Sequence, residues 1–132
     1  MKKDFFRPST LHPTHGYSHA ISVEGGRLVV LSGQVSFDEK RELVGEGDFA
    51  AQTRQVFENI GFALSAAGAS YADVIKLDYF VTDFNDEYRD TIVKIRDEYI
   101  CTENPPVNTL LGVTTLGAPG LLIEIEATAF IE

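Results

Sequence analysis

The sequence has few residues that could hold the chain together through covalent or metal bonds. Its 132 residues include one cysteine, Cys101, which excludes an internal disulfide and a cluster of thiolate ligands and fits a reducing compartment. No apolar run approaches the roughly 20 residues that cross a bilayer. The basic start, residues 1–8, is not followed by the apolar stretch of a secretory signal, so we expect a cytoplasmic protein with no membrane partner.

Basic residues are also scarce. Only 11 Lys and Arg stand against 20 Asp and Glu, which gives a formal net charge of −9. Because proteins bind nucleic acids largely by neutralising phosphates with Lys and Arg, we do not expect a nucleic-acid partner. The sequence also lacks a Gly-x-Ser-x-Gly elbow, a phosphate-binding loop and a dinucleotide-binding fingerprint, which argues against the enzyme classes built on those motifs.

The remaining composition is that of an ordinary globular domain, with 44% apolar and 23% charged residues. We expect one domain over residues 1–132, long enough to bury a core. The three histidines, His12, His15 and His19, cluster near the start, and their spacing does not match a helical pair of metal ligands. A loop could still bring two of them together, but we predict no metal site.

Short β-type runs follow an N-terminal segment, residues 1–18, which is rich in Pro, His, Ser and Thr and is predicted to be irregular. The runs Ala20–Val23 and Leu28–Val35 are separated by Glu24-Gly25-Gly26-Arg27. Because a Gly-Gly pair accepts positive φ at both central turn positions, we predict a tight hairpin. Gly33, within the second run, indicates a bulge or the close approach of another group.

Two later segments carry apolar residues at helical spacing. The first helix is predicted from a cap at Asp48 to about Ala67, with Gly68 directly after it. A strand, Val74–Thr82, separates it from a second helix that begins near Asn85. Since each helix has a single apolar stripe, both helices can pack on the same face of one sheet.

The C-terminal stretch, Pro105–Glu132, is predicted to form two strands joined by a Gly-Ala-Pro-Gly turn. Apolar and polar residues alternate along the last strand, so its two faces differ. One face carries Ile123, Ile125, Ala127, Ala129 and Ile131, and the other carries Glu124, Glu126, Thr128 and Phe130. The predicted order is β-β-α-β-α-β-β, an α+β fold with two helices on one face of a single sheet.

The second face of that sheet has no helix to cover it. It would present the carboxylates of Asp78, Glu124 and Glu126 beside four apolar side chains, Val74, Phe80, Leu122 and Phe130. A face too apolar for water and too charged for a core is typical of an oligomer interface that contains polar sites.

Glu124 and Glu126 are the first candidates for chemistry. Two residues apart on a strand, their carboxyl groups can lie about 6–7 Å apart on one side. A carboxyl group half-buried on such a face has a raised pKa and can act as a general acid or base. The alternative is that both are solvated or ion-paired residues of an edge strand.

Other candidates allow both a binding and a structural interpretation. Ser32 and Gly33 could offer a hydroxyl and backbone N–H groups to an anionic or carbonyl ligand, or they could form a β-bulge. Tyr17 could line a pocket or cover the core. Asn108, after Pro105-Pro106-Val107, could be only a turn residue, and Cys101 is predicted to be structural because no base stands beside it.

These segments together resemble the RidA/YjgF family of reactive-intermediate deaminases along nearly the whole chain. The resemblance rests on six stretches: Gly16–Ala20, Leu31–Val35, Ala50–Gln55, Ala66–Ala69, Lys76–Asp83 and Pro105–Glu132. It implies a chorismate-mutase-like fold assembled as a homotrimer, with small-molecule clefts between subunits. Active members hydrolyse enamine and imine intermediates, such as 2-aminoacrylate, to 2-oxo acids and ammonia without a cofactor.

The same resemblance assigns roles to individual residues. Glu124 matches the family's catalytic glutamate, and Tyr17, Ser32 and Gly33 match its pocket residues. Leu110 matches a position that contacts the ligand through its backbone.

The family's arginine, which pairs with the substrate carboxylate, is replaced here by Asn108. An amide lacks the charge and the two-pronged donor of a guanidinium, and losing such a pair weakens binding by about 2–5 kcal/mol. Two functions follow: a hydrolase acting on C=N bonds whose substrate preference is altered at Asn108, or a small-molecule-binding trimer without catalysis. Some members have been labelled ribonucleases, but the acidic charge disfavours that role.

Overall fold

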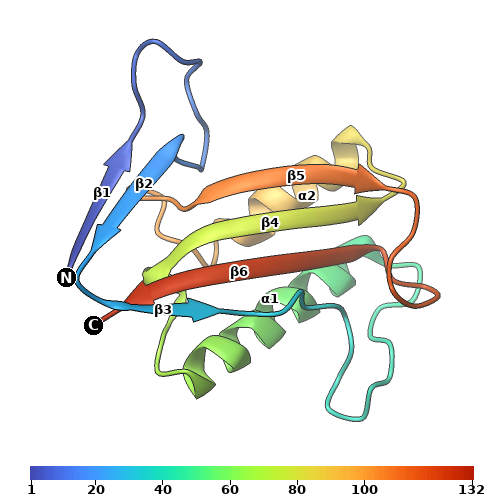
Figure 1. Cartoon of the computed structure of the whole chain (residues 1–132). Helices are drawn as coiled ribbons and strands as arrows, with labels where there is room; N and C mark the ends of the chain where they lie inside the picture. Colours follow the sequence, from blue (N-terminus) through green and yellow to red (C-terminus); the bar gives the residue numbers. More distant parts are fainter.

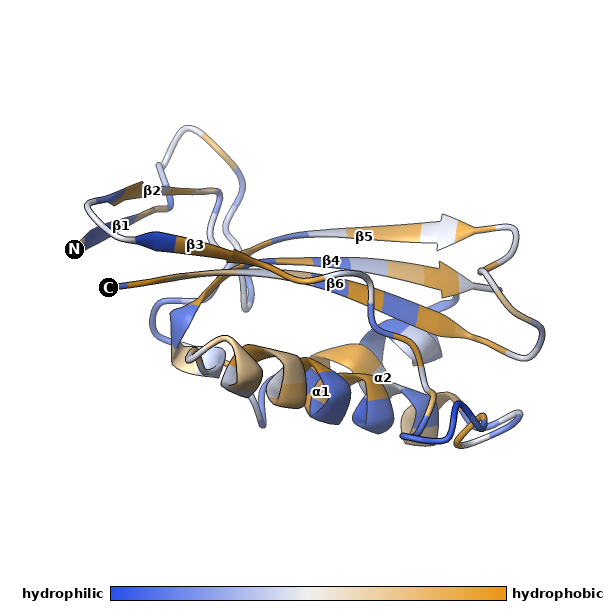
Figure 2. Ribbon diagram, turned by 60° about the horizontal axis from the view of Figure 1, so that its bottom comes forward, coloured by the Kyte–Doolittle hydropathy of each residue, from blue (hydrophilic) through white to orange (hydrophobic).

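The computed structural model describes all residues from Met1 to Glu132 (Figure 1). Six strands, two α-helices and one short 3₁₀ helix follow one another along the chain. Their bounds are β1 Lys2–Phe6, β2 Ala20–Glu24, β3 Arg27–Val30, α1 Phe49–Ala66, the 3₁₀ helix Tyr71–Asp73, β4 Val74–Thr82, α2 Asp86–Arg96, β5 Val107–Val113 and β6 Ile123–Ile131. The predicted α+β class, with two helices on one face of a sheet, is confirmed (Figure 2).

The main sheet has four strands in the order β3-β6-β4-β5. β6 pairs antiparallel with β3 and with β4, whereas β4 and β5 run parallel. A parallel pair needs a crossover, and α2 supplies it between β4 and β5. The two C-terminal strands are therefore neighbours in the sequence but are separated in the sheet by β4.

The N-terminal pairing differs from the prediction. Lys2–Phe6, expected to be irregular, forms β1 and pairs antiparallel with β2, with Phe5 opposite Ile21. The predicted tight hairpin around Gly25 and Gly26 is wrong, because β2 pairs with β1 while β3 pairs with β6. The Gly-Gly pair does turn the chain, but a turn does not determine which strands hydrogen-bond, and here it separates the two sheets.

Both predicted helices are confirmed, and their caps explain where they begin. The Asp48 side chain accepts a hydrogen bond from the backbone N–H of Ala51 at 3.0 Å, and that of Asn85 accepts one from Tyr88 at 2.9 Å. Gly68, with φ of +77°, ends α1 as expected. Neither helix is long and apolar enough to cross a membrane.

The core lies between the helices and the sheet. Ile123, Ile125 and Ala129 of β6 are at most 1% exposed, which confirms the predicted inward face of this strand. From α1 the core receives Val56, Phe57, Ile60 and Leu64, and from β4 it receives Leu77, Tyr79 and Val81. Each fully buried large apolar side chain contributes about 1.5–3 kcal/mol relative to exposure.

One residue of β4 faces the side opposite to that predicted. Val74 pairs with Ala129 and Lys76 pairs with Thr128, so Ile75 is an extra residue in a bulge. The bulge reverses the alternation before it, and Val74, expected on the helix-free face, is 4% exposed in the core. Leu122, also expected on that face, packs against the core. The strand pairing keeps Asp78, Phe80, Glu124, Glu126 and Phe130 on the predicted side.

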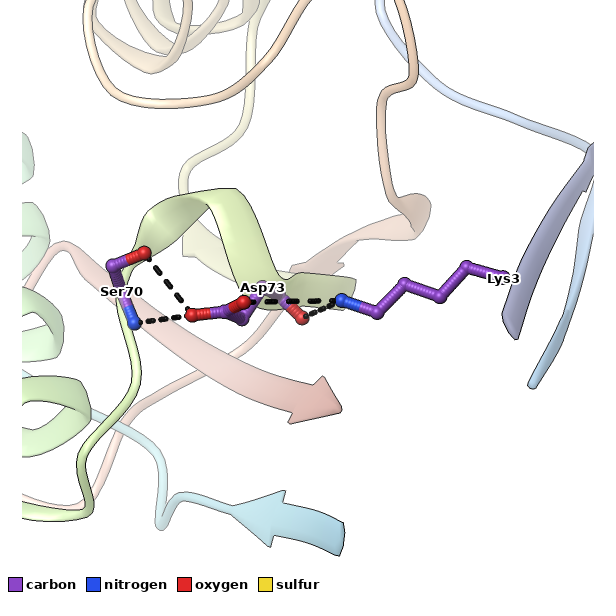
Figure 3. A network of polar contacts seen from close by, with 3 residues as sticks. All are labelled: Lys3, Ser70 and Asp73. Atoms are coloured by element: carbon purple, nitrogen blue, oxygen red, sulfur yellow. Dashed lines mark hydrogen bonds and ion pairs between the residues drawn. The ribbon is translucent and has the colours of Figure 1, made fainter. Parts of the chain in front are cut away.

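The two-stranded sheet is tied to the main body near the 3₁₀ helix (Figure 3). Lys3 donates to the backbone carbonyl of Asp73 at 3.4 Å and lies 4.0 Å from its carboxylate. The same carboxylate accepts hydrogen bonds from the backbone N–H and hydroxyl of Ser70, at 2.8 and 3.1 Å. Asp73 therefore caps its own helix and holds β1.

Gln52 of α1 joins the helix to the turn that precedes β6. Its side chain is fully buried, and it donates to the carbonyls of Gly45 and Gly120 at 3.1 and 2.9 Å. Its Oε1 accepts from the backbone N–H of Leu122 at 2.9 Å. These three bonds fix the entrance of the strand that carries Glu124.

We expect Gln52→Ala to lower the free energy of unfolding by about 2–4 kcal/mol, because it removes three hydrogen bonds and takes their partner from the Gly120 carbonyl and the Leu122 N–H, whereas the Gly45 carbonyl keeps a bond from the Asp48 N–H. Urea denaturation at one fixed protein concentration measures this change. Gln55→Ala is the matched control, since Gln55 donates only to Asn59 on the same helix and should change stability by about 0.5 kcal/mol or less. Equal losses in the two variants would contradict the role of Gln52.

Candidate functional site

Glu124 lies on the helix-free face of β6, against the backbone that follows β3. Gln34 and Ile125 exchange two backbone hydrogen bonds, of 2.8 and 3.0 Å, which hold residues 32–34 beside β6. A Cβ atom at position 33 would collide with the Glu124 carboxylate where it lies here, so a larger residue would displace the carboxylate. The close approach predicted at Gly33 is therefore present, and the group that approaches is Glu124.

The environment of Glu124 favours its neutral form. Burial raises the pKa of this half-buried carboxyl group, and repulsion from the neighbouring Glu126 raises it further. Both carboxylates line a pocket of about 440 Å³ with Phe80, Val113 and residues 115–117. This combination of a raised pKa and an open pocket is typical of a general acid or base.

Tyr17 lies far from Glu124, beside the start of β5. The adjacent Ser18 is buried, and its backbone N–H donates to the carbonyl of Pro106 at 3.1 Å. Its hydroxyl donates to the carbonyl of Pro105 at 2.7 Å. These bonds fix Tyr17 next to the paired prolines that lead into Asn108.

Asn108 and Leu110 belong to the same neighbourhood. In the parallel pairing of β4 and β5, Asn108 lies opposite Leu77 and Leu110 lies opposite Tyr79. Residues opposite each other share a face, so both lie on the helix side of the sheet, where Leu110 packs against the core. Asn108 is half-buried.

The predicted site residues thus form two groups that one chain does not bring together. We call Ser32, Gly33 and Glu124 the Glu124 group, and Tyr17, Asn108 and Leu110 the Tyr17 group. β4 lies between β6 and β5, and Glu124 is level with Phe80 whereas Asn108 is level with Leu77. The two groups are therefore separated by about 10 Å across the sheet and about 10 Å along it, on opposite faces.

Two residues beside Tyr17 were not found by sequence reasoning. His12 Nε2 lies 2.9 Å from the Tyr17 hydroxyl, and the guanidinium of Arg96 lies against Gly16. The histidine cluster signalled the first, but only as a metal candidate. No group of three or more His, Cys, Asp or Glu residues is arranged to hold a metal ion.

The helix-free face also carries charged side chains that are only partly paired with one another. Asp78 lies opposite Glu126 across the β4–β6 pair, and one of its oxygens is 3.3 Å from Lys76 Nζ. The other oxygen is buried without a hydrogen-bond partner. This face therefore carries polar groups that a single chain leaves incompletely satisfied.

The chain is similar in sequence to a known protein family and to several of its members. The family model described as Endoribonuclease L-PSP matches residues 8–131. A RutC family protein of Pyrococcus horikoshii is 37% identical over 132 residues, covering 100% of both chains. A human protein named 2-iminobutanoate/2-iminopropanoate deaminase is 33% identical over 113 residues, covering 86% of this chain and 78% of its own.

The fold is shared with a solved structure as well. The crystal structure of a Rid-family protein of unknown function from Yersinia pestis has a TM-score of 0.88 and 36% sequence identity, and the match covers 99% of this chain and 100% of that one. With a family model that spans most of the sequence and full-length relatives above 30% identity, the chain belongs to the RidA/YjgF family, which the Endoribonuclease L-PSP model represents.

Proposed function

We propose that this protein is a cofactor-free hydrolase of imines and enamines that releases ammonia at a site completed between neighbouring copies of the chain. The observation that carries the proposal is the half-buried Glu124 carboxyl group, held against Gly33 with a raised pKa. The activity named for the human relative, 2-iminobutanoate/2-iminopropanoate deaminase, supports the same class of reaction. The separation of the Glu124 and Tyr17 groups supports a shared site.

The helix-free face supports assembly of several copies, which we propose to be a homotrimer. Leu28, Val30 and Leu111 are 57%, 69% and 47% exposed, and the register of β3 and β5 places them on this face. An apolar face of this kind is costly in water and is typical of subunit contacts. A closed ring of three copies would bring the β3 edge of one chain toward the β5 edge of the next.

The reaction needs one base that later acts as an acid. The imine reacts as its iminium form, with a proton taken from solvent. The Glu124 carboxylate takes a proton from water while the water oxygen bonds to the iminium carbon and the C=N π electrons move to nitrogen, which gives a neutral tetrahedral adduct. Glu124 then returns its proton to the nitrogen of the adduct, the C–N bond breaks as the adduct's hydroxyl proton passes to solvent, and ammonia and a carbonyl product leave. A pKa above the usual carboxyl range suits both roles, because the group must gain and lose a proton within one cycle.

The other predicted residues shape the site. Ser32 and Gly33 leave space beside Glu124, Tyr17 offers a hydroxyl, and Leu110 offers backbone groups. Asn108 would hydrogen-bond the end of the substrate remote from the C=N bond. Because its amide is neutral, we propose a substrate whose remote end is less charged than a carboxylate.

A second function, small-molecule binding without turnover, is favoured by one observation. Asn108 stands where the family resemblance expects the arginine that holds a substrate carboxylate. Without that charge the pocket could retain a ligand too weakly oriented to react. Turnover and binding must therefore be measured separately.

We expect Glu124→Gln to lower the rate of ammonia release from enzymatically generated imines by about 10²–10⁴-fold, because the amide cannot exchange the proton. In the wild type, kcat/KM should rise as the pH increases through the raised pKa of Glu124. This rise, the Glu124 limb of the pH profile, should be absent in the variant. A coupled assay for ammonia across a pH series measures both effects.

Glu126→Gln is the matched control. Glu126 lies on the same face of β6 and raises the Glu124 pKa by repulsion, so its removal should shift the limb to lower pH while leaving the plateau rate nearly unchanged. Equal plateau rates in Glu124→Gln and the wild type would exclude Glu124 as the catalytic group.

Asn108→Arg should tighten binding of a 2-oxo acid such as 2-oxobutanoate by about 30-fold or more, because it restores a charge-assisted pair. Isothermal titration measures the affinity, and Asn108→Gln, which adds length without charge, is the control. If the arginine variant gains turnover of 2-aminoacrylate, the rest of the site is competent. Tighter binding with no turnover in either protein supports the binding function instead.

A mixing experiment tests whether the site is shared between chains. Glu124→Gln and Tyr17→Phe chains, each with low activity, should recover activity when they are unfolded together and refolded. In a ring of three with one altered group on each chain type, about a quarter of the sites would be intact. No recovery in mixed oligomers, verified by mass spectrometry, would place both groups in the site of one chain.

A further inference from the structure

Tyr17 is held at its hydroxyl end by a histidine that the proposed reaction does not use. His12 Nε2 lies 2.9 Å from the Tyr17 hydroxyl. The His12 position is fixed in turn by His19, whose Nε2 donates to the His12 carbonyl at 2.8 Å. The His12 and His19 rings meet edge to face with centroids 4.7 Å apart. The hydroxyl of Tyr17 is therefore directed toward His12.

The backbone end of Tyr17 is held by Arg96 from α2. Gly16 has φ of +76°, and a Cβ atom there would collide with the Arg96 guanidinium. Both facts restrict this position to glycine. Arg96 Nε and Nη2 donate to the same Asp97 oxygen at 3.0 and 2.9 Å, which fixes the plane of the guanidinium under the Gly16–Tyr17 segment.

The surroundings of Arg96 are poorly suited to a purely stabilising role. The residue is 4% exposed, whereas its only carboxylate partner, Asp97, has a side chain that is 43% exposed. The nearby Tyr79 hydroxyl is buried without a hydrogen-bond partner. Burial raises the pKa of Tyr79, and its interaction with Arg96 offsets part of this effect although the two groups form no hydrogen bond of normal geometry. Burying a charge with so few partners costs stability.

Arg96 is also in the right place to affect the Tyr17 group. Tyr79 lies opposite Leu110 in the β4–β5 pair, on the helix side of the sheet. Arg96 therefore lies between this pair of strands and the segment that carries Tyr17. Its guanidinium lies against Gly16, so it limits where the Gly16–Tyr17 segment can lie.

We propose that Arg96 and His12 are positioning residues for Tyr17, one fixing its backbone and the other aiming its hydroxyl. The proposal rests on the function proposed above, in which Tyr17 contributes to an imine-hydrolysing site. Neither residue touches the substrate. Each acts by restricting where the tyrosine hydroxyl can lie when the neighbouring chain supplies Glu124.

The test follows the surroundings of the Tyr17 ring by NMR, a measurement that does not require turnover. The protein is labelled with 3-fluorotyrosine, and the Tyr17 resonance among the five tyrosines is assigned with Tyr17→Phe by ¹⁹F NMR. We expect His12→Gln and Arg96→Lys to shift or broaden this resonance. Both should also lower kcat for imine hydrolysis by about tenfold to a hundredfold, with a smaller change in KM, because the reacting groups are misaligned rather than lost.

The controls come from the same two elements. His15→Gln alters a histidine of the same segment that makes no hydrogen bond, and Arg89→Lys alters an exposed arginine of α2 paired with Asp86. Neither should move the Tyr17 resonance or kcat. If Arg96→Lys does not fold, Asp97→Asn provides the second variant, since it loosens the guanidinium without removing it.

An unchanged Tyr17 resonance and unchanged kcat in His12→Gln and in the Arg96 or Asp97 variant would overturn the proposal. A shifted resonance with normal kcat would also overturn it, because Tyr17 would then move without consequence for the reaction. If the wild type turns over no imine, the proposed function fails, and the resonance alone still decides whether the two residues fix Tyr17.

Discussion

The alternation of β6 is the constraint on which the rest of the structure depends. Ile123, Ile125 and Ala129 must face the helices to close the core, and a strand has only two faces. Glu124 and Glu126 are therefore forced onto the face without helices. The carboxylates do not reach that face through any interaction of their own, so the packing of the core also places the candidate acid and base. A one-residue slip of β6 would bury both carboxylates and expose the core at once.

Because β6 occupies the centre of the sheet, the two edges are left to β3 and β5 (Figure 1). The Glu124 group lies on β6 and on the backbone that follows the edge strand β3, the Tyr17 group lies at the edge strand β5, and β4 keeps the two groups apart within the chain. The same arrangement leaves apolar side chains such as Val30 and Leu111 exposed on the helix-free face. Two incomplete groups and an uncovered apolar face are explained together if copies of the chain associate. Neither observation requires a ligand, a metal or a further domain to account for it.

Much of the fold could be predicted because its signals are local. The caps at Asp48 and Asn85, the glycine after α1 and the alternation of β6 are each read from a few neighbouring residues. The errors concern relations between distant residues. The residues that pair with β2 lie 14 to 22 positions upstream, from Phe6 opposite Ala20 to Lys2 opposite Glu24. The bulge at Ile75 reverses the face of Val74 without any glycine or proline to mark it. Periodicity carries no information about either.

The candidate site shows the same division. The sequence could predict Glu124 as a candidate and a close approach at Gly33, because a glycine in a strand indicates such an approach, and the structure shows that the two residues are in contact. Arg96 was not, since a basic residue in the last turn of a helix is normally solvated and interacts with the helix end. Arg96 can be buried because Gly16 has no side chain to occupy the same space. The contact thus depends on a glycine and an arginine that are 80 residues apart, and no local pattern predicts it.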